Sequence, residues 1–182
     1  MDRITKTDLN RYSNVSEIRA YWNAILIHPG ARFMFIYRKC RKYKKTHPLG
    51  LIFRIWYKLL TSRFNVEIPH SSNLGKGLYI GHFMNIVINQ NVVIGENCNI
   101  MQGVTIGHES RGKRKGSPII SNRVLIGPNS VVVGNIKIGN DVLIGPLTLV
   151  NFDVPAYSVV IGNPGKIVSS KGSIGYIKKI LI

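Results

Sequence analysis

The sequence is poor in cysteine, in acidic side chains and in long apolar stretches. Its 182 residues include 2 Cys, which excludes a small domain held together by several disulfides, and we interpret Cys40 and Cys98 as reduced intracellular thiols. The first ten residues, MDRITKTDLN, lack the apolar core of a signal peptide. The longest apolar run, from Phe33 to Tyr37, is far shorter than the roughly 20 residues of a membrane-spanning helix. Hydrophobic residues make up 45% of the chain, which excludes disorder, so we expect a folded cytoplasmic protein.

Acidic residues are so few that the net charge is +17. Residues 1–65 hold 14 of the 25 Lys and Arg but only 3 of the 8 Asp and Glu. A positive field of this kind attracts phosphate groups, whether on nucleic acid, on an anionic lipid surface or on a phosphorylated small molecule. The charge alone does not choose among these partners.

The second half of the chain has a six-residue period. An Ile, Leu or Val returns at every sixth position, with a two-residue step after Ile86 and an interruption after Ile106. The fourteen positions are Ile68, Leu74, Ile80, Ile86, Ile88, Ile94, Ile100, Ile106, Ile120, Ile126, Val132, Ile138, Ile144 and Val150. A helix would need a period of about 3.6 and would not tolerate the Gly that follows many of them. The period therefore predicts short strands joined by corners, in coils that stack about 4.8 Å apart.

This period also divides the chain. Residues 66–166 are long enough for about five coils, and residues 107–119 (GHESRGKRKGSPI) break the period and predict a loop at one corner. Residues 1–65 have apolar stripes at helical spacing. The clearest stripe is Leu51, Ile52, Ile55, Trp56, Leu59 and Leu60. Residues 167–182 form a tail that we expect to cap the last coil as a short helix or strand.

The repeat, with the stretch GKGLYIGHFMNIVINQNVVIGENCNIMQGVTIG at residues 75–107, resembles the hexapeptide-repeat acyltransferases. Within them it resembles the serine acetyltransferase group, and in that group it is most similar to the capsular and exopolysaccharide O-acetyltransferases. GNPGK at 162–166 resembles that group's closing Gly-x-Pro-Ala-Lys. The resemblance implies a mainly β fold, a left-handed parallel β-helix behind an α-helical segment. It also implies acetyl-CoA as co-substrate, no metal, and a homotrimer with clefts between subunits. An ordinary β-sandwich is the alternative fold.

The resemblance places the catalytic histidine of the family at His82. A histidine suits the removal of a proton from a hydroxyl near neutral pH, after which the oxygen attacks the thioester of acetyl-CoA. Glu67, 15 residues earlier, stands where the family has a carboxylate that orients the imidazole. The alternatives are a corner histidine without a role and a solvated surface acid.

The resemblance also assigns residues to the coenzyme. It places the pantetheine and nucleotide near Gly107, Gly127, Ser130 and Lys166. Lys113 belongs to the basic loop, where cations suit the phosphates of coenzyme A. A loop that is solvated and has no ligand is the alternative interpretation.

Two positions bear on the acceptor. Serine acetyltransferases have Asp before the catalytic histidine and a second histidine before the repeat restarts, where this chain has Gly81 and Ser117. Both changes remove groups suited to a small zwitterion, and glycine at position 81 is expected to open space for a bulkier ring. The sequence therefore favours a sugar hydroxyl of a surface polysaccharide or its precursor, with His108 lining the cleft. Serine O-acetylation for cysteine synthesis and a non-catalytic β-helix scaffold are the alternatives.

The basic, aromatic residues 31–63 leave three interpretations open. They form a helical cap whose aromatic side chains belong to the core, or they dock on an anionic membrane surface at the inner face of the membrane. Binding of nucleic acid is the third, and no nucleic-acid-binding motif supports it, so we expect no nucleic acid as a partner.

Overall fold

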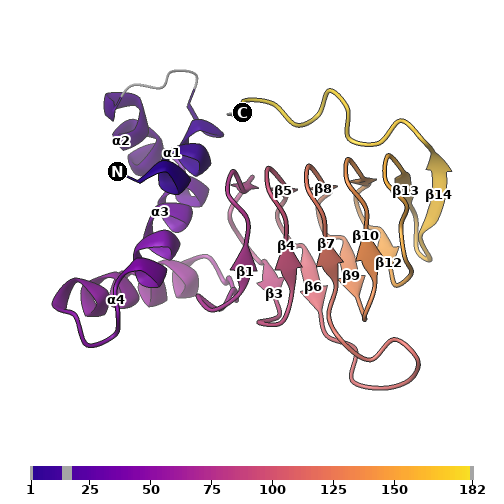
Figure 1. Ribbon diagram of the computed structural model, residues 1–182, viewed down its shortest axis with the longest axis horizontal. Helices are drawn as coiled ribbons and strands as arrows, with labels where there is room; N and C mark the ends of the chain where they lie inside the picture. The colour runs from indigo at the N-terminus through magenta and orange to yellow at the C-terminus, as the bar shows by residue number, and fades with distance from the viewer. Residues whose placement is uncertain (1, 14–17, 181–182) are drawn as a thin grey trace.

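The computed structural model describes residues 2–13 and 18–180, and places four helices at one end of a stack of coils (Figure 1). The helices are α1 (Arg3–Asn10), α2 (Ile18–Ile27), α3 (Pro29–Lys42) and α4 (Pro48–Arg63). Residues 14–17 of the predicted helical segment and the last two residues of the predicted tail lie outside the described residues.

The short strands of successive coils stack into three sheets, in which all neighbouring strands are parallel except β13 and β14. The first sheet contains β1 (Asn73–Leu74), β4 (Val93–Ile94), β7 (Ile119–Ile120) and β10 (Lys137–Ile138). The second contains β2 (Tyr79–Ile80), β5 (Asn99–Ile100), β8 (Leu125–Ile126), β11 (Leu143–Ile144), β13 (Val159–Ile161) and β14 (Lys166–Ser169). The third contains β3 (Val87–Ile88), β6 (Thr105–Gly107), β9 (Val131–Val133) and β12 (Leu149–Val150). The predicted left-handed parallel β-helix of about five coils is confirmed.

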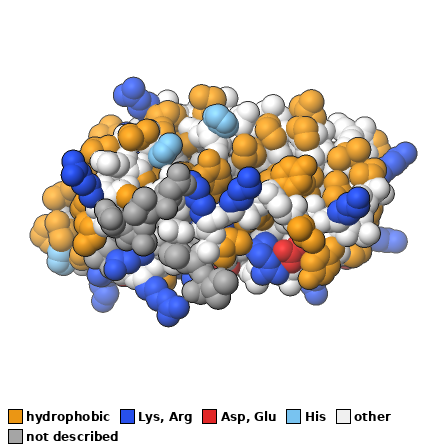
Figure 2. All heavy atoms as spheres, turned by 90° about the horizontal axis from the view of Figure 1, so that it is seen from above, with side chains coloured by type: hydrophobic (Ala, Val, Ile, Leu, Met, Phe, Trp, Pro, Cys, Tyr) orange, Lys and Arg blue, Asp and Glu red, His pale blue; other side chains and the backbone are white. Residues whose placement is uncertain are grey.

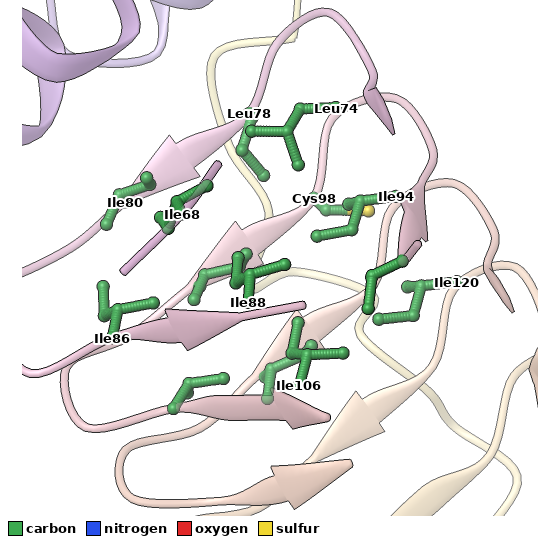
Figure 3. Packing of buried hydrophobic residues seen from close by; sticks show 14 of the residues in the cluster. Ile68, Leu74, Leu78, Ile80, Ile86, Ile88, Ile94, Cys98, Ile106 and Ile120 are labelled. Atoms are coloured by element: carbon green, nitrogen blue, oxygen red, sulfur yellow. The ribbon is translucent and has the colours of Figure 1, made fainter. Parts of the chain in front are cut away.

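The aliphatic residues of the six-residue period form the core of this stack. All fourteen are buried, with at most 4% of the residue exposed, and partners such as Ile88 and Ile106 lie in register on neighbouring coils (Figure 3). A second inward position, four residues after most of these aliphatics, is buried too, as at Leu78 and Cys98. Met84 is different, because it lies in the corner with the two extra residues and is 47% exposed. At the two-residue step of the period, the second inward side chain therefore turns to the surface instead of the core.

The tail does more than cap the last coil. Its first residues form β14, which pairs antiparallel with β13. The chain then runs back along the coils towards α1 (Figure 1). There the Ser173 hydroxyl donates to the Arg123 carbonyl at 2.7 Å, and the Asn10 side chain donates to the Lys179 carbonyl at 2.9 Å. The tail thus ties the middle of the stack to the first helix.

Helix α4 turns a different face towards the core from the one that its apolar stripe predicted. The side chains that pack against the core are Phe53, Tyr57, Leu60 and Phe64. The predicted Leu51, Ile52, Ile55, Trp56 and Leu59 are instead 45–64% exposed. Because α4 is apolar on more than one side, its periodicity did not distinguish the inner face from the outer one.

The helical segment both covers the first coils and leaves apolar side chains in solvent. Phe33 and Tyr37 of α3 are fully buried, whereas Trp22 and Leu26 of α2 are 49% and 69% exposed. No helix in residues 2–13 and 18–180 is long and apolar enough to cross a membrane. Docking on a membrane surface stays a prediction.

Candidate active site

His82 lies in the corner between β2 and β3, where the period has its two-residue step. Its backbone has a φ of +50°, in the left-handed region, and its side chain is exposed. The next residue, Phe83, is buried and packs on Phe33 of α3 at 4.8 Å and on Phe64 at 5.6 Å between ring centroids. The helical segment therefore fixes the corner from inside while the imidazole faces outwards.

The exposed imidazole lines a pocket of about 530 Å³ between this corner and the helices. Its other lining residues are Tyr12, His28, Pro29, Gly30, Phe64, Tyr79, Ile80, Phe83, Met84 and Gln102. Helix α3 can pack closely against β2 and Tyr12 because Gly30 has no side chain. A Cβ there would lie 2.3 Å from the Ile80 carbonyl oxygen and 2.8 Å from the Tyr12 hydroxyl. The volume falls within the range typical of small-molecule sites.

Two polar groups of this pocket were not assigned a role from the sequence. The Tyr12 hydroxyl accepts a hydrogen bond from the Ile80 amide at 2.7 Å, and burial raises the pKa of Tyr12. The Gln102 side-chain oxygen is buried and has no hydrogen-bond partner in the described structure. Gln102 belongs to the Gln-Gly-Val-Thr motif, so the signal was present in the sequence, but a motif does not show that an acceptor is unpaired.

A second pocket, of about 450 Å³, lies along the third sheet and brings other predicted residues together. Glu67, Gly107 and His108 line it. The His108 Nδ1 lies 3.1 Å from the Ser117 hydroxyl, which in turn donates to the Asn89 side-chain oxygen at 3.4 Å. Asn89 was not expected from the sequence. The imidazole of His108 thus lies beside Ser117, the position at which the resemblance expects a second histidine.

The structure does not join Glu67 to His82. Among the described residues no hydrogen bond or ion pair connects the carboxylate with the imidazole, and the two line different pockets. The Glu67 backbone adds to the edge of the third sheet, donating to the Ile86 carbonyl at 2.8 Å. An orienting role for Glu67 stays a prediction.

Gly81 does not open the space expected of it. A Cβ at this position would lie 3.0 Å from the Met101 sulfur and 3.1 Å from the Tyr79 ring. The Tyr79 and Met101 side chains therefore lie close against the point where a side chain at position 81 would begin.

The residues predicted to hold the coenzyme are spread along the stack. Lys113 is exposed in the 107–119 loop, and Lys166 is exposed at the start of β14. Gly127 is buried at a corner, where a Cβ would lie 2.8 Å from the backbone of Gly145. Ser130 is fully buried, and its hydroxyl donates to the Gly145 carbonyl at 2.7 Å. In this structure the Ser130 hydroxyl therefore serves the packing of neighbouring coils.

The coils, the outward imidazole and its pocket define a hexapeptide-repeat transferase. Residues 117–151 match the model of the bacterial transferase hexapeptide family (six repeats). The structure also superposes on that of Neisseria gonorrhoeae serine acetyltransferase in complex with serine, with a TM-score of 0.73 and 28% identity. That superposition covers 92% of this chain and 68% of the other.

Two relatives identify the family more specifically. The serine acetyltransferase of Staphylococcus aureus is 33% identical over 171 residues, which are 94% of this chain and 74% of that protein. The serine acetyltransferase of Synechococcus elongatus is 34% identical over 148 residues, 81% of this chain and 60% of that protein. This chain belongs to the serine acetyltransferase family, although it spans under two thirds of the length of the Synechococcus relative.

The expectation of a sugar acceptor is wrong. It depended on Gly81 and Ser117, whereas the relatives matched over most of the chain are serine acetyltransferases. The structure supplies the physical reason. Tyr79 and Met101 take the space beside Gly81, so no bulkier ring gains room there, and His108 supplies an imidazole beside Ser117.

Proposed function

We propose that this protein transfers the acetyl group of acetyl-CoA to the hydroxyl of L-serine. The observation that carries the proposal is the exposed imidazole of His82 in a pocket of about 530 Å³, in a chain that aligns over 94% of its length with a serine acetyltransferase. In this proposal acetyl-CoA is the co-substrate, and O-acetylserine and free coenzyme A are the products.

In the proposed reaction, His82 takes the proton of the serine hydroxyl as the oxygen attacks the thioester carbonyl. The carbon–oxygen bond forms, the carbon–sulfur bond then breaks, and the imidazolium returns the proton to the departing thiolate. A general base of this kind contributes about 10²- to 10⁴-fold in rate. Backbone N–H groups near the corner would stabilise the oxyanion that forms on the way.

Gln102 is our candidate for holding the serine ammonium. Its side-chain oxygen lies in the His82 pocket, is buried and lacks a partner, so it is free to accept an N–H from the substrate. A buried acceptor without a donor costs free energy, and a bound ammonium would remove that cost. This contact would take over part of what the missing carboxylate at Gly81 does in relatives.

The second pocket would complete the site from a neighbouring subunit. His82 lines one pocket of the chain, and His108, with Asn89, lines another. A homotrimer with clefts between subunits would let both histidines act on one substrate pair. Lys113 would then face the phosphates of the coenzyme. Sedimentation of a 20 kDa monomer at micromolar concentration would contradict this part of the proposal.

The direct test is release of the coenzyme A thiol with serine as the acceptor, with O-acetylserine identified by mass spectrometry. We expect serine-dependent turnover with kcat/KM above about 10⁴ M⁻¹ s⁻¹. Gln102→Leu, which keeps the bulk of the side chain, should raise KM for serine and leave KM for acetyl-CoA unchanged. Absence of serine-dependent thiol release from the folded protein would overturn the proposal.

A further inference from the structure

Arg11 at the end of α1 carries a buried charge that forms no ion pair with any acid of residues 2–13 and 18–180. The residue is 4% exposed, and one terminal nitrogen donates to the side-chain oxygen of Asn99 on β5. The other terminal nitrogen and Nε are buried and have no partner in the described structure. Such an arrangement is costly, because a buried guanidinium normally has a carboxylate or several carbonyl acceptors.

Two buried carboxylates of the described structure are paired with other arginines. Asp8, one turn earlier on α1, pairs with Arg38 at 2.7 Å. Asp141, to which the Ser173 backbone is bonded, pairs with Arg123 at 2.6 Å. Each of these carboxylates therefore already has a guanidinium partner other than Arg11.

Arg11 borders a pocket of about 230 Å³ between the second sheet and the C-terminal tail. Tyr79 and Asn99 of the sheet and Tyr176, Lys178 and Lys179 of the tail form the rest of its lining. The bond from Asn10 to the Lys179 carbonyl and the bond from Ser173 to Arg123 hold the tail in place on either side of these residues. Figure 2 shows this face of the molecule, on which blue Lys and Arg side chains are common and red Asp and Glu side chains are scarce.

Three cations thus meet at one small pocket, and none of the described residues that line it is acidic. The volume is below the roughly 300 to 1,000 Å³ of sites for drug-sized ligands, so it fits a small ligand or one group of a larger one. A guanidinium and two ammonium groups together suit a phosphate, which carries more charge than a carboxylate.

We propose that this pocket binds a phosphate group, free or carried by a small metabolite, and that Arg11, Lys178 and Lys179 supply its counter-charge. The ligand would contact the lysines and lie against the part of Arg11 that lines the pocket, and its charge would balance that of the buried guanidinium. Tyr79 is shared with the His82 pocket, where its ring lies 4.7 Å from that of Tyr12, so an aromatic wall separates the two sites. The proposal does not depend on the reaction at His82.

The test measures binding of inorganic phosphate by calorimetry at constant ionic strength, with chloride replacing phosphate in the reference. We expect saturable binding to the full chain. The double variant Lys178→Ala/Lys179→Ala should weaken it about tenfold or more, since it removes two charge-assisted contacts to the phosphate. The matched control is Lys44→Ala/Lys45→Ala, which removes two adjacent exposed lysines between α3 and α4 and should leave the affinity unchanged.

One further variant and one further ligand complete the test. Arg11→Met should also abolish binding, and the lysine variant keeps the proposal testable if this buried substitution prevents folding. Glycerol 3-phosphate distinguishes a free phosphate from a phosphate ester, because tighter binding of the ester identifies a metabolite as the ligand. No saturable binding of phosphate, or equal losses in the two double-lysine variants, would overturn the proposal.

Discussion

Asp8 and Arg38 form a buried ion pair that fastens two helices to the first coil. The carboxylate of Asp8 on α1 is fully buried, accepts from Arg38 of α3 at 2.7 Å, and also accepts from the Gly77 amide at 2.7 Å. Arg38 in turn donates to the carbonyls of Leu74 and Gly75. The pair thus sets the position of the helical segment that forms half of the His82 pocket.

Asp8→Asn should destabilise the protein severely, because it leaves the Arg38 guanidinium buried without a counter-ion. The expected loss in the free energy of unfolding is about 3–5 kcal/mol, measured by urea denaturation. Asp141→Asn is the matched control, since the Arg123 side chain of that pair is 41% exposed, and it should cost less than about 1 kcal/mol. Equal losses in the two variants would contradict the structural role of the Asp8–Arg38 pair.

Gly30→Ala tests the close approach of α3 to β2. Alanine normally favours a helix over glycine by about 0.5–1 kcal/mol, but here its Cβ would meet the Ile80 carbonyl oxygen at 2.3 Å. We therefore expect a net loss of about 1–3 kcal/mol in the free energy of unfolding. Gly107→Ala is the stability control, because its Cβ would lie 3.6 Å from Val133, an ordinary contact. A stabilised Gly30→Ala variant would show that the helix does not approach the coil as described.

His70 should make the protein less stable in mild acid. His70 is largely exposed, but partial desolvation, with the positive charges of Arg54 and Arg41, lowers its pKa from the ordinary 6.5. Below pH 6.5 the unfolded chain then binds a proton before the folded one does, so the free energy of unfolding falls as the pH falls through this window. His70→Gln should show a smaller loss between about pH 7.5 and about pH 5, by urea denaturation. An unchanged pH dependence would contradict the assignment.

Much of the fold could be predicted because the period of aliphatic residues is also the geometry of the coil. Ile88 and Ile106 must both point inwards when strands stack in register, so their spacing predicts the stack. The same argument fails for α4, where apolar residues occur on several faces and only contact with Phe33 and the first coils selects Tyr57 over Trp56.

The sequence predicted which residues belong to the candidate site, but not which of them lie together in one pocket. His82 and His108 each follow from a motif, but one chain places them in separate pockets, which a linear sequence does not show. The interpretation of Gly81 as open space failed because the side chains that fill it, Tyr79 and Met101, come from its own strand and from the next coil. Substitution patterns alone therefore misidentified the acceptor.

The central claim, that His82 is the base in acetyl transfer to serine, is tested most directly by the rate of O-acetylserine formation in His82→Asn. Asparagine tolerates the φ of +50° at this corner, so the variant should fold, and we expect kcat to fall by about 10²- to 10⁴-fold. His70→Asn, an exposed histidine away from the pocket, should keep the wild-type rate. Wild-type formation of O-acetylserine by folded His82→Asn would contradict the account.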